Sequence, residues 1–436
     1  MLSGISADRP SQALGVSVRR AYRSGGLVVQ PRMGFSDPAT MRRGLIATRE
    51  ATANTIGTIT LDSYTRTGDY QSASRALENG GALNGYPLVT HSPATTRAVV
   101  DGIGKPDFPI QVRHGSARPQ RIIMAMAAAG LAATEGGPVS YCLPYGRVPL
   151  RESIANWKQS CDMLAAARCD VGDPHVETFG GCMMGQLCPP SLLVAISILE
   201  ALFFWHHGIR SISLSYAQQA NQDQDVEAIT ALRALARRYV PADDQHVVIY
   251  AYMGVYPATV PGARALLTEA ARLASRTASE RLIVKTVAEA YRIPTIPENV
   301  EALETAAAAA SVPVAAEHGT YDSEVGAEAA VLIERVLDLS PEPGEALASA
   351  FERGYLDVPY CLHPDNAGRS ASYIGEDGRL RWSSAGSMPI GHLRTAGHPH
   401  RMSSADLLAA LGYVARKFDQ MGALSRSDRA LPPAAG

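Results

Sequence analysis

The sequence predicts an α/β protein, a (β/α)8 TIM-type barrel that is followed by an α-rich and irregular C-terminal extension. Short apolar runs alternate with amphipathic helical stretches along the first two thirds of the chain, a pattern typical of parallel strands joined by crossover helices. The chain has 436 residues, which is ample, because such barrels commonly use more than about 200 residues as one unit. Arginine, glycine and tyrosine recur after the apolar runs, where a barrel carries its functional groups.

Nine apolar runs are candidate strands, one more than the barrel needs. Two of the intervening helices have clear starts, because a proline in the first turn follows Asp37 in one and Pro189 in the other. The sequence does not say which run is accessory or not a strand. The nine runs are residues 27–32, 56–62, 87–91, 109–113, 131–135, 175–179, 211–216, 246–252 and 281–286.

The predicted organisation has three parts. They are an N-terminal segment (1–22), the barrel (23–295) and the extension (296–436). We expect most of the N-terminal segment to be frayed, as well as the tail from Ala430. The extension should contain helices near 297–310, 323–338 and 344–353, and then an irregular stretch over 358–381.

The composition argues against some classes of function. Lys and Arg number 40 and Asp and Glu 42, so the formal net charge of -2 argues against a general nucleic-acid-binding surface. The longest apolar segment, Ser191 to Trp205, is too short to span a bilayer and predicts a core helix. The N-terminus has arginines but no apolar signal core, so we expect a soluble, cytoplasmic protein.

Several common catalytic patterns are missing. The six cysteines include no CxxC pair, which favours reduced thiols over a disulfide scaffold or a zinc ribbon. No nucleotide phosphate loop, GxGxxG fingerprint, GxSxG elbow or HExxH motif occurs. The His206–His207 pair ends an apolar helix, where capping is a better explanation than metal binding. We therefore expect no metal site in this chain.

Three arginines follow successive apolar runs, namely Arg32, Arg66 and Arg113. A guanidinium at a strand tip presents a planar fork that matches a carboxylate. Each arginine alone could be an ordinary surface ion pair worth about 0–1 kcal/mol. Three of them at successive strand ends predict a site for a small dianion, most simply a dicarboxylate.

The next strand end supplies groups that complement an amino acid. Glu135 precedes Tyr141 and Tyr145, which are four residues apart, and Gly136–Gly137 permits close backbone approach. A carboxylate suits an ammonium and the phenols offer directed hydrogen bonds. Together with the arginines, these residues predict a pocket for a dicarboxylic amino acid.

Lys285 and Glu289 form a further candidate pair after the last run. Their spacing of four residues suits a plain i,i+4 ion pair at the start of a helix, and it also suits two groups that both grip a hydroxylated ligand. Spacing alone favours the plain pair.

These motifs resemble the E (large, catalytic) subunit of glutamate mutase, also called methylaspartate mutase. The resemblance runs in order from about residue 25 to 295 and continues more weakly over 354–368. The segments that carry it are GTITLDSYTR (57–66), LNGYP (83–87), QVRHG (111–115), TEGGPVSY (134–141) and VKT (284–286), followed by DVPY (357–360) and NAG (366–368).

The resemblance implies a fold, a reaction and a cofactor. The family is a β/α barrel that works with adenosylcobalamin in glutamate metabolism and interconverts L-glutamate and (2S,3S)-3-methylaspartate by radical rearrangement. It implies that three arginines clamp the two substrate carboxylates, that a glutamate meets the amino group and that two tyrosines line the substrate. The matching residues here are Arg32, Arg66, Arg113, Glu135, Tyr141 and Tyr145.

The resemblance also implies cofactor contacts. Lys285 and Glu289 fall at positions that contact the adenosyl ribose. Gly34, Thr60 and Met253 fall among the other residues that contact the cofactor.

Two departures from the family pattern leave alternatives open. The string from Asp173 to Thr178 lacks the glycine of the cobalt-ligating D-x-H-x-x-G loop, so we expect a separate small cobalamin-binding subunit in a hetero-oligomer with a dimer of this chain. The alternative is that the 358–400 segment of this chain holds the corrinoid itself, through His363 or His398. Tyr250–Gly254 stands where the family often has His-Gln-Trp-Met, which allows a related 2-amino or 2-hydroxy dicarboxylate, or a non-catalytic barrel that binds a dicarboxylic amino acid.

Overall fold

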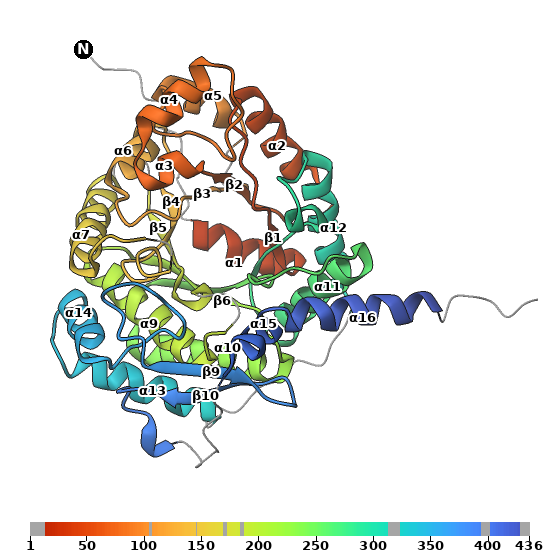
Figure 1. Cartoon of the computed structure of the whole chain (residues 1–436). Coiled ribbons are helices and arrows are strands. Elements are labelled where there is room, and N and C mark those ends of the chain that lie inside the picture. Colours follow the sequence, from red (N-terminus) through yellow and green to blue (C-terminus); the bar gives the residue numbers. More distant parts are fainter. Residues whose placement is uncertain are drawn as a thin grey trace, which may run out of the picture.

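A computed structural model describes residues 14–103, 107–144, 146–168, 172–183, 187–312, 323–393 and 402–427. Eight parallel strands form one barrel, in the order β1-β8-β7-β6-β5-β4-β3-β2, which confirms the predicted fold class (Figure 1). The strands are β1 (Val28–Gln30), β2 (Gly57–Thr60), β3 (Ile110–Arg113), β4 (Ala133–Gly136), β5 (His175–Thr178), β6 (Ser211–Ala217), β7 (Asp244–Tyr250) and β8 (Arg281–Ile283).

The barrel closes between its first two strands. Val29 bridges to Thr55 in parallel, and its N–H donates to the carbonyl of Asn54 at 2.8 Å. At the end of β2, the Thr60 N–H donates to the carbonyl of Met33 at 2.9 Å. The chain that leaves β1 is thereby fixed beside the end of β2.

One of the nine predicted strands is wrong, the run at 87–91. Only Tyr86 reaches the sheet, through a bridge to Leu61 and a 2.9 Å hydrogen bond from its N–H to Thr60. Pro87 has no N–H to donate, and the N–H groups of Thr90 and His91 both return to its carbonyl, which makes a turn. The other eight predicted runs all overlap the barrel strands.

Helices surround the barrel, and side-chain caps fix several starts. Asp37 accepts from the Thr40 N–H at 2.8 Å with a proline in the first turn, as the sequence predicts. The barrel helices are α2 (Pro38–Glu50), α3 (Ser63–Thr67), α4 (Tyr70–Glu78), α5 (Pro93–Val100), α6 (Gln120–Ala128), α7 (Leu150–Ala166), η1 (Gly180–Cys182), α9 (Pro190–His206), α10 (Gln222–Tyr239), α11 (Val260–Arg276), η2 (Val287–Ala290) and α12 (Ile296–Ala310).

Helix α9 is the predicted apolar core helix. Nearly every residue from Pro190 to Phe204 is buried, because α10, α13 (Glu324–Leu337) and α14 (Pro343–Arg353) pack around it in addition to the barrel. An all-apolar surface is expected of a helix that is covered on every side. No helix in the described part of the chain is long and apolar enough to cross a membrane.

The three helices expected near 297–310, 323–338 and 344–353 are present as α12, α13 and α14, and the first of them packs against the barrel. The stretch at 358–381 is not wholly irregular. It holds β9 (Ser370–Ile374), which pairs antiparallel with β10 (Leu380–Ala385). A turn at Gly378, with a φ of +79°, joins the two strands. The segments η3 (Gly391–Leu393), α15 (Ser404–Leu411) and α16 (Tyr413–Ser427) follow.

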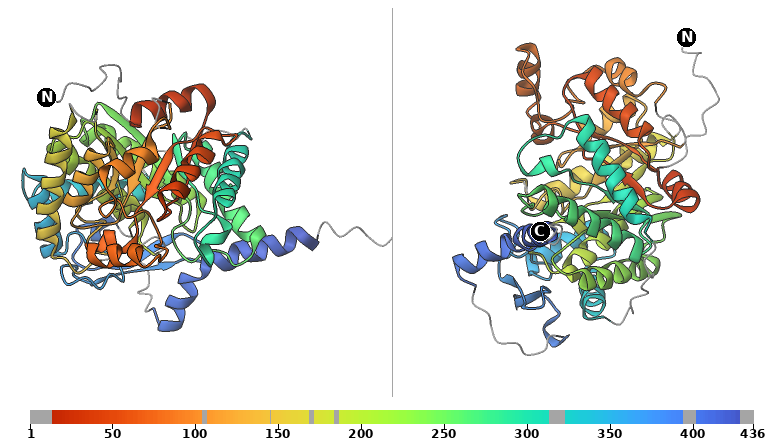
Figure 2. Two further views of the ribbon diagram at one scale, coloured as in Figure 1. Left: turned by 90° about the horizontal axis from the view of Figure 1, so that it is seen from above. Right: turned by 90° about the vertical axis from the view of Figure 1, so that its right-hand side faces the viewer.

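The N-terminal segment is ordered from Leu14, where α1 (Leu14–Gly25) begins, so the prediction of fraying is wrong for residues 14–22. Leu14 and Val18 are buried, and Arg19 pairs with Asp244 at the start of β7. Helix α1 therefore covers the N-terminal end of the barrel, opposite α16 (Figure 2). Residues 1–13 and the tail from Ala430 lie outside the described residues.

Candidate active site

The centre of the candidate site is an ion pair between neighbouring strands. Arg113 ends β3, Glu135 lies in β4, and Arg113 Nε donates to Glu135 Oε2 at 2.7 Å. Their side chains are only 5% and 3% exposed. A buried pair of this kind is expensive unless further hydrogen bonds satisfy it.

Two phenols supply those bonds. Tyr141 donates to Glu135 Oε1, and Tyr250 donates to Oε2 at 2.6 Å. Burial opposes ionisation, but Arg113 and the hydrogen bonds outweigh it, so the pKa of Glu135 lies below its ordinary value. Burial and the nearby Glu135 raise the pKa of both phenols well above the ordinary value, so both keep their protons.

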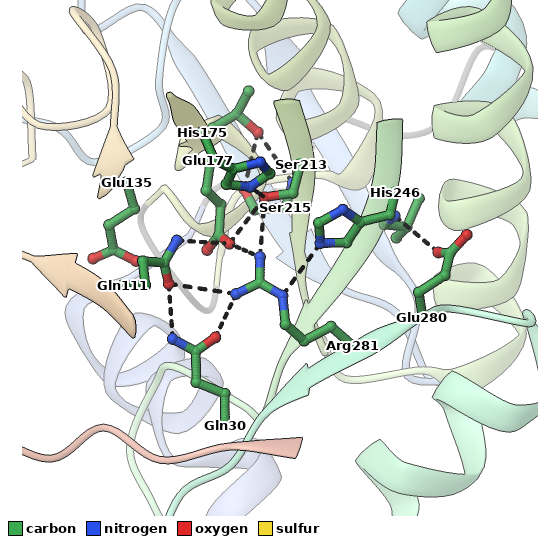
Figure 3. A network of polar contacts seen from close by, with 12 residues as sticks. Gln30, Gln111, Glu135, His175, Glu177, Ser213, Ser215, His246, Glu280 and Arg281 are labelled. Carbon is green, nitrogen blue, oxygen red and sulfur yellow. Dashed lines mark hydrogen bonds and ion pairs between the residues drawn. The ribbon is translucent and has the colours of Figure 1, made fainter. Parts of the chain in front are cut away.

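Beneath this pair, the barrel interior holds a second buried ion pair. Arg281 and Glu177 are both fully buried, and their contact is a direct N–H to carboxylate bond (Figure 3). Gln30 and Gln111 complete the layer; Gln111 donates to Glu177 at 3.2 Å, and Gln30 accepts from Arg281. The polar side chains satisfy one another, as a low-dielectric interior requires.

Tyr250 connects the two ion pairs. Its hydroxyl contacts Glu135 above and Glu177 below, and its ring lies 5.2 Å from the Arg113 guanidinium carbon. Phe179 packs edge-on against the same ring at 5.5 Å. The Tyr250 side chain is fully buried, so this link is part of the barrel interior.

His114 lines the same site. Its ring stacks on Trp157 at 5.7 Å and meets Tyr141 edge-on at 5.2 Å. Burial lowers the pKa of His114 to about 4, against a smaller opposing effect of Glu135, so the imidazole is neutral. Because Nδ1 accepts from the Ser116 N–H, the proton is on Nε2, which is buried and has no hydrogen-bond partner among the described residues.

On the β1–β8 side, Arg32 and Glu289 form a partly exposed ion pair of 2.9 Å. Glu289 also accepts from the Thr286 N–H at 3.1 Å, which fixes it at the start of η2. The plain pair of Lys285 with Glu289 is therefore not what the structure shows. Lys285 lies instead over the ring of Tyr256, 4.8 Å from its centroid.

Lys285 has an unusual environment for an amine. It is only 8% exposed, and no hydrogen bond or ion pair to it is found among the described residues. Burial and the nearby Arg32 lower its pKa to about 8, while Glu289 opposes the shift.

Near these residues, the backbone at Gly34 passes close to the backbone at Thr60. A Cβ on Gly34 would overlap the carbonyl oxygen of Thr60, so the close contact between the two chain segments requires glycine. The hydroxyls of Thr60 and Thr286 are buried and have no partner in the described part of the chain. Lone buried hydroxyls beside a buried amine suit a ligand that carries hydroxyl groups.

Arg66 is not at a strand end, contrary to the prediction. Strand β2 stops at Thr60, and Arg66 lies in the short helix α3, which begins after an Asp62 cap. The side chain is exposed and lies against Gly115, directly after the β3 end. Arg66 thus approaches the site from the solvent side, beside the loop that follows Arg113.

Of the other predicted residues, Met253 is half-buried and packs on the main core, and Tyr145 lies outside the described residues. Sequence reasoning singled out Tyr250 as a departure that could alter the substrate, but it missed Glu177 and Arg281 as members of the site. Glu177 lies within a predicted strand, and a single charged residue in or at the start of a strand gives no signal.

The cysteines and the isolated histidines take no part in a metal centre within the described ranges. The five cysteines described there are buried free thiols, and burial raises the pKa of Cys142 to about 12. No group of three or more His, Cys, Asp and Glu side chains there could hold a metal ion. His175, in the string that partly matches a cobalt-ligating loop, has both ring nitrogens on Ser211 and Ser213 inside the barrel.

The fold and these strand-end groups define a (β/α)8 barrel of the enzyme type, with a buried arginine–glutamate pair at the end that carries function. A family model described as "Methylaspartate mutase E chain (MutE)" matches residues 10–406, and the chain belongs to this family. It is therefore a subunit of a mutase, which is an isomerase, and the resemblance seen in the sequence is confirmed.

Relatives from several organisms support the assignment. A glutamate mutase epsilon subunit of Escherichia coli O157:H7 is 30% identical over 399 residues, which cover 86% of this chain and 80% of the relative. That of Yersinia enterocolitica is 30% identical over 349 residues, 76% and 72% of the two chains. That of Halobacterium salinarum is 32% identical over 347 residues, 76% and 71% of the two chains.

Proposed function

We propose that this chain is the catalytic subunit of an adenosylcobalamin-dependent mutase that interconverts L-glutamate and (2S,3S)-3-methylaspartate. The observation that carries the proposal is the buried Arg113–Glu135 pair with its phenol donors, in a chain of the methylaspartate mutase E family. The relatives are named for glutamate mutase, which supports the substrate class.

The arrangement suits a substrate with two carboxylates and one ammonium. Arg66 and Arg32 face the open side, and Arg113 keeps the Nη groups of its fork for a ligand while Nε holds Glu135. The Glu135 carboxylate can accept from a ligand's ammonium in place of one of its phenol donors. The neutral His114 offers its unpartnered Nε2–H as a further donor.

These groups hold the substrate without acid–base chemistry. Arginine cannot lose its proton at physiological pH, and its bidentate bonds to carboxylates are strong and directional. Two anchored carboxylates would keep the carbon fragments in place while one carbon–carbon bond breaks and another forms, which is a proximity effect. The surrounding buried rings of Trp157, Tyr141 and Phe179 exclude water from the reacting carbons.

The residues on the β1–β8 side fit the adenosyl part of the proposed cofactor. Lys285, Thr60 and Thr286 present buried polar groups for ribose hydroxyls, Glu289 lies beside them, and Gly34 allows close approach. When bound, adenosylcobalamin supplies a carbon radical that removes a hydrogen atom from the substrate. The residues of this chain orient the ribose and hold the substrate beside it.

We further propose that a separate small subunit carries most of the corrinoid. The relatives are named epsilon subunits, which supports an enzyme of more than one kind of chain. His175 and His363 are both engaged inside this chain, the latter with the carbonyl of Val148 at 2.9 Å. His398 lies outside the described residues. The dimer of this chain within the complex remains a prediction.

An anaerobic assay tests the function. The chain, a cobalamin-binding small subunit of the same enzyme and adenosylcobalamin are mixed with L-glutamate, and chiral chromatography follows 3-methylaspartate. We expect turnover in both directions. If neither compound is converted while the cofactor is demonstrably bound, the proposal is wrong.

Tyr250 favours one second candidate, a mutase for another 2-amino or 2-hydroxy dicarboxylate, because this phenol already occupies Glu135 Oε2 and could reshape the pocket. A substrate panel decides, and a clear preference for L-glutamate would exclude it. A non-catalytic binding barrel would bind L-glutamate equally with and without cobalamin, which calorimetry measures.

A further inference from the structure

Tyr250 occupies a position where one hydrogen serves two carboxylates. Its hydroxyl contacts Glu135 Oε2 at 2.6 Å and also contacts Glu177 Oε1. A phenol carries a single hydrogen, so at any moment it donates fully to only one of the two oxygens. The two buried glutamates are thereby coupled through one side chain.

The two glutamates differ in what else they hold. Glu135 also accepts from Arg113 and Tyr141, so it keeps two donors if the phenol turns away. Glu177 Oε1 has no other donor among the described residues, because Arg281, Gln111 and Ser213 all donate to Oε2. The phenol hydrogen bond therefore stabilises Glu177 more than Glu135 whenever Glu135 gains another donor.

We propose that Tyr250 is a positioning residue for ammonium recognition: its hydroxyl satisfies Glu135 in the empty site and turns to Glu177 when a ligand's ammonium takes its place on Glu135. This inference rests on the proposed function, since it assumes an amino dicarboxylate ligand. The hydroxyl gives the Glu135 carboxylate a third donor before the substrate arrives, which offsets the cost of burying its charge in a low-dielectric site. The Glu177–Arg281 pair anchors the hydroxyl from below.

The groups that face this unit from all sides are charged or titratable. They are Arg113 from β3, His114 from the loop after β3, Tyr141 from the loop after β4, Glu177 from β5, Cys182 from η1 and Arg281 from β8. Arg113 and Arg281 offset the two carboxylates, and His114 and Cys182 are neutral at physiological pH. The single phenol hydrogen therefore lies between two carboxylates that each have an arginine partner.

The variant Tyr250→Phe removes the shared hydroxyl and keeps the ring. Without it, Glu177 Oε1 has no donor among the described residues, and Glu135 keeps only Arg113 and Tyr141. A Glu135 carboxylate that is held by fewer donors is less well positioned for an ammonium. We expect the affinity for L-glutamate to fall about tenfold, which is the scale of one charge-assisted hydrogen bond.

Two controls make the test selective. Glutarate has both carboxylates but no ammonium, so its affinity should stay unchanged in Tyr250→Phe. The variant Tyr216→Phe is matched, because Tyr216 is another buried tyrosine that donates to a buried carboxylate, Asp225, at 2.8 Å away from the site. It should leave the affinity for both ligands unchanged.

Calorimetric titrations of L-glutamate and glutarate give the affinities, and infrared spectra of the free protein report the carboxylate stretching bands. Tyr250→Phe should shift two of these bands relative to the wild-type protein, because both Glu135 and Glu177 lose the shared hydroxyl. Equal L-glutamate affinity in the two proteins, or a parallel loss for both ligands, would overturn the inference. If the wild-type protein binds no L-glutamate, the proposed function fails, and the infrared bands alone decide whether the hydroxyl is shared.

Discussion

At the scale of single residues, the site depends on how buried charges are paired. Arg113 has Glu135 on its Nε and the Tyr250 ring against its face, whereas Arg66 is exposed and Arg32 shares its charge with Glu289. The three arginines that look equivalent in the sequence thus have different electrostatic environments. The buried one should dominate the energetics, because solvent does not screen its contacts.

Arg113→Lys should be far from conservative. A lysine replaces the planar fork by a point charge and cannot hold Glu135 and a ligand carboxylate together. The truncation of a buried charge pair costs about 2–5 kcal/mol, so kcat/KM should fall by roughly 30-fold or more. Arg118→Lys is the matched control, since Arg118 pairs with Glu152 at the surface and that pair is worth little. Near-wild-type kinetics of Arg113→Lys would place Arg113 outside the site.

Lys285→Met should stabilise the protein without its ligands. The folded pKa of Lys285 is about 8 and its ordinary value is 10.5, so between these pH values the unfolded chain binds more protons and stability rises with pH. Below pH 8 the buried charge costs about 3 kcal/mol, which the methionine avoids. Urea unfolding at pH 7 and pH 10 measures the gain, which should be largest at pH 7 and shrink at pH 10. The exposed Lys158→Met should show neither effect.

At the scale of elements, α9 positions the loop that carries Tyr141. Glu200 on this helix accepts from the N–H groups of Val139 and Ser140, at 3.2 and 2.9 Å, and from the Ser140 hydroxyl. A Cβ on Gly137 would overlap the same carboxyl group, so the loop approaches the helix closely only because that position is glycine. An apolar helix thus holds one polar group that anchors a site loop.

Glu200→Gln should remove a pH dependence of stability. Burial raises the pKa of Glu200 to about 7 from an ordinary 4.5, and the hydrogen bonds of the loop oppose the shift. Between these values the folded chain binds more protons, so this group makes stability fall as the pH rises from 4.5 to 7, by about 3 kcal/mol in total. The difference in unfolding free energy between wild type and variant, measured from pH 5 to 8, should show that slope. Glu50→Gln, at an exposed position, is the control and should show none.

At the scale of the whole molecule, different elements lie at the two ends of the barrel. Helix α1 covers the N-terminal end, and α16 and the β9–β10 hairpin lie towards the other end (Figure 2). Helix α16 packs on α11, and its Val414 and Phe418 join a small core with Tyr252 and Tyr256 from the loop after β7. The extension therefore borders the site end on one side.

The isolated chain should be colourless and inactive. It should not retain adenosylcobalamin on a sizing column followed by visible absorbance, because the described histidines near a cobalt-ligating pattern are engaged inside the fold. The addition of a small cobalamin-binding subunit should yield a coloured complex of higher mass. Stoichiometric uptake of the corrinoid by this chain alone would contradict the two-component proposal.

The sequence by itself was sufficient for the barrel class, eight of its strands, the apolar core helix and the three helices of the extension, because each depends on local periodicity and capping. It also predicted that Arg113 and Glu135 belong to one pocket, since neighbouring parallel strands bring their ends together. The strand predicted at 87–91 is not present, and the hairpin at 370–385 was not predicted. In both cases a short apolar or polar run does not reveal its pairing partner.

Only the tertiary structure decided which groups pair. Glu289 bonds to Arg32 from the first strand instead of Lys285, four residues away, and Tyr250 links Glu135 to Glu177 across the barrel interior. These contacts join segments more than 70 residues apart, so no local pattern encodes them. Their strength comes from burial, which exists only once the barrel has closed and water has been excluded.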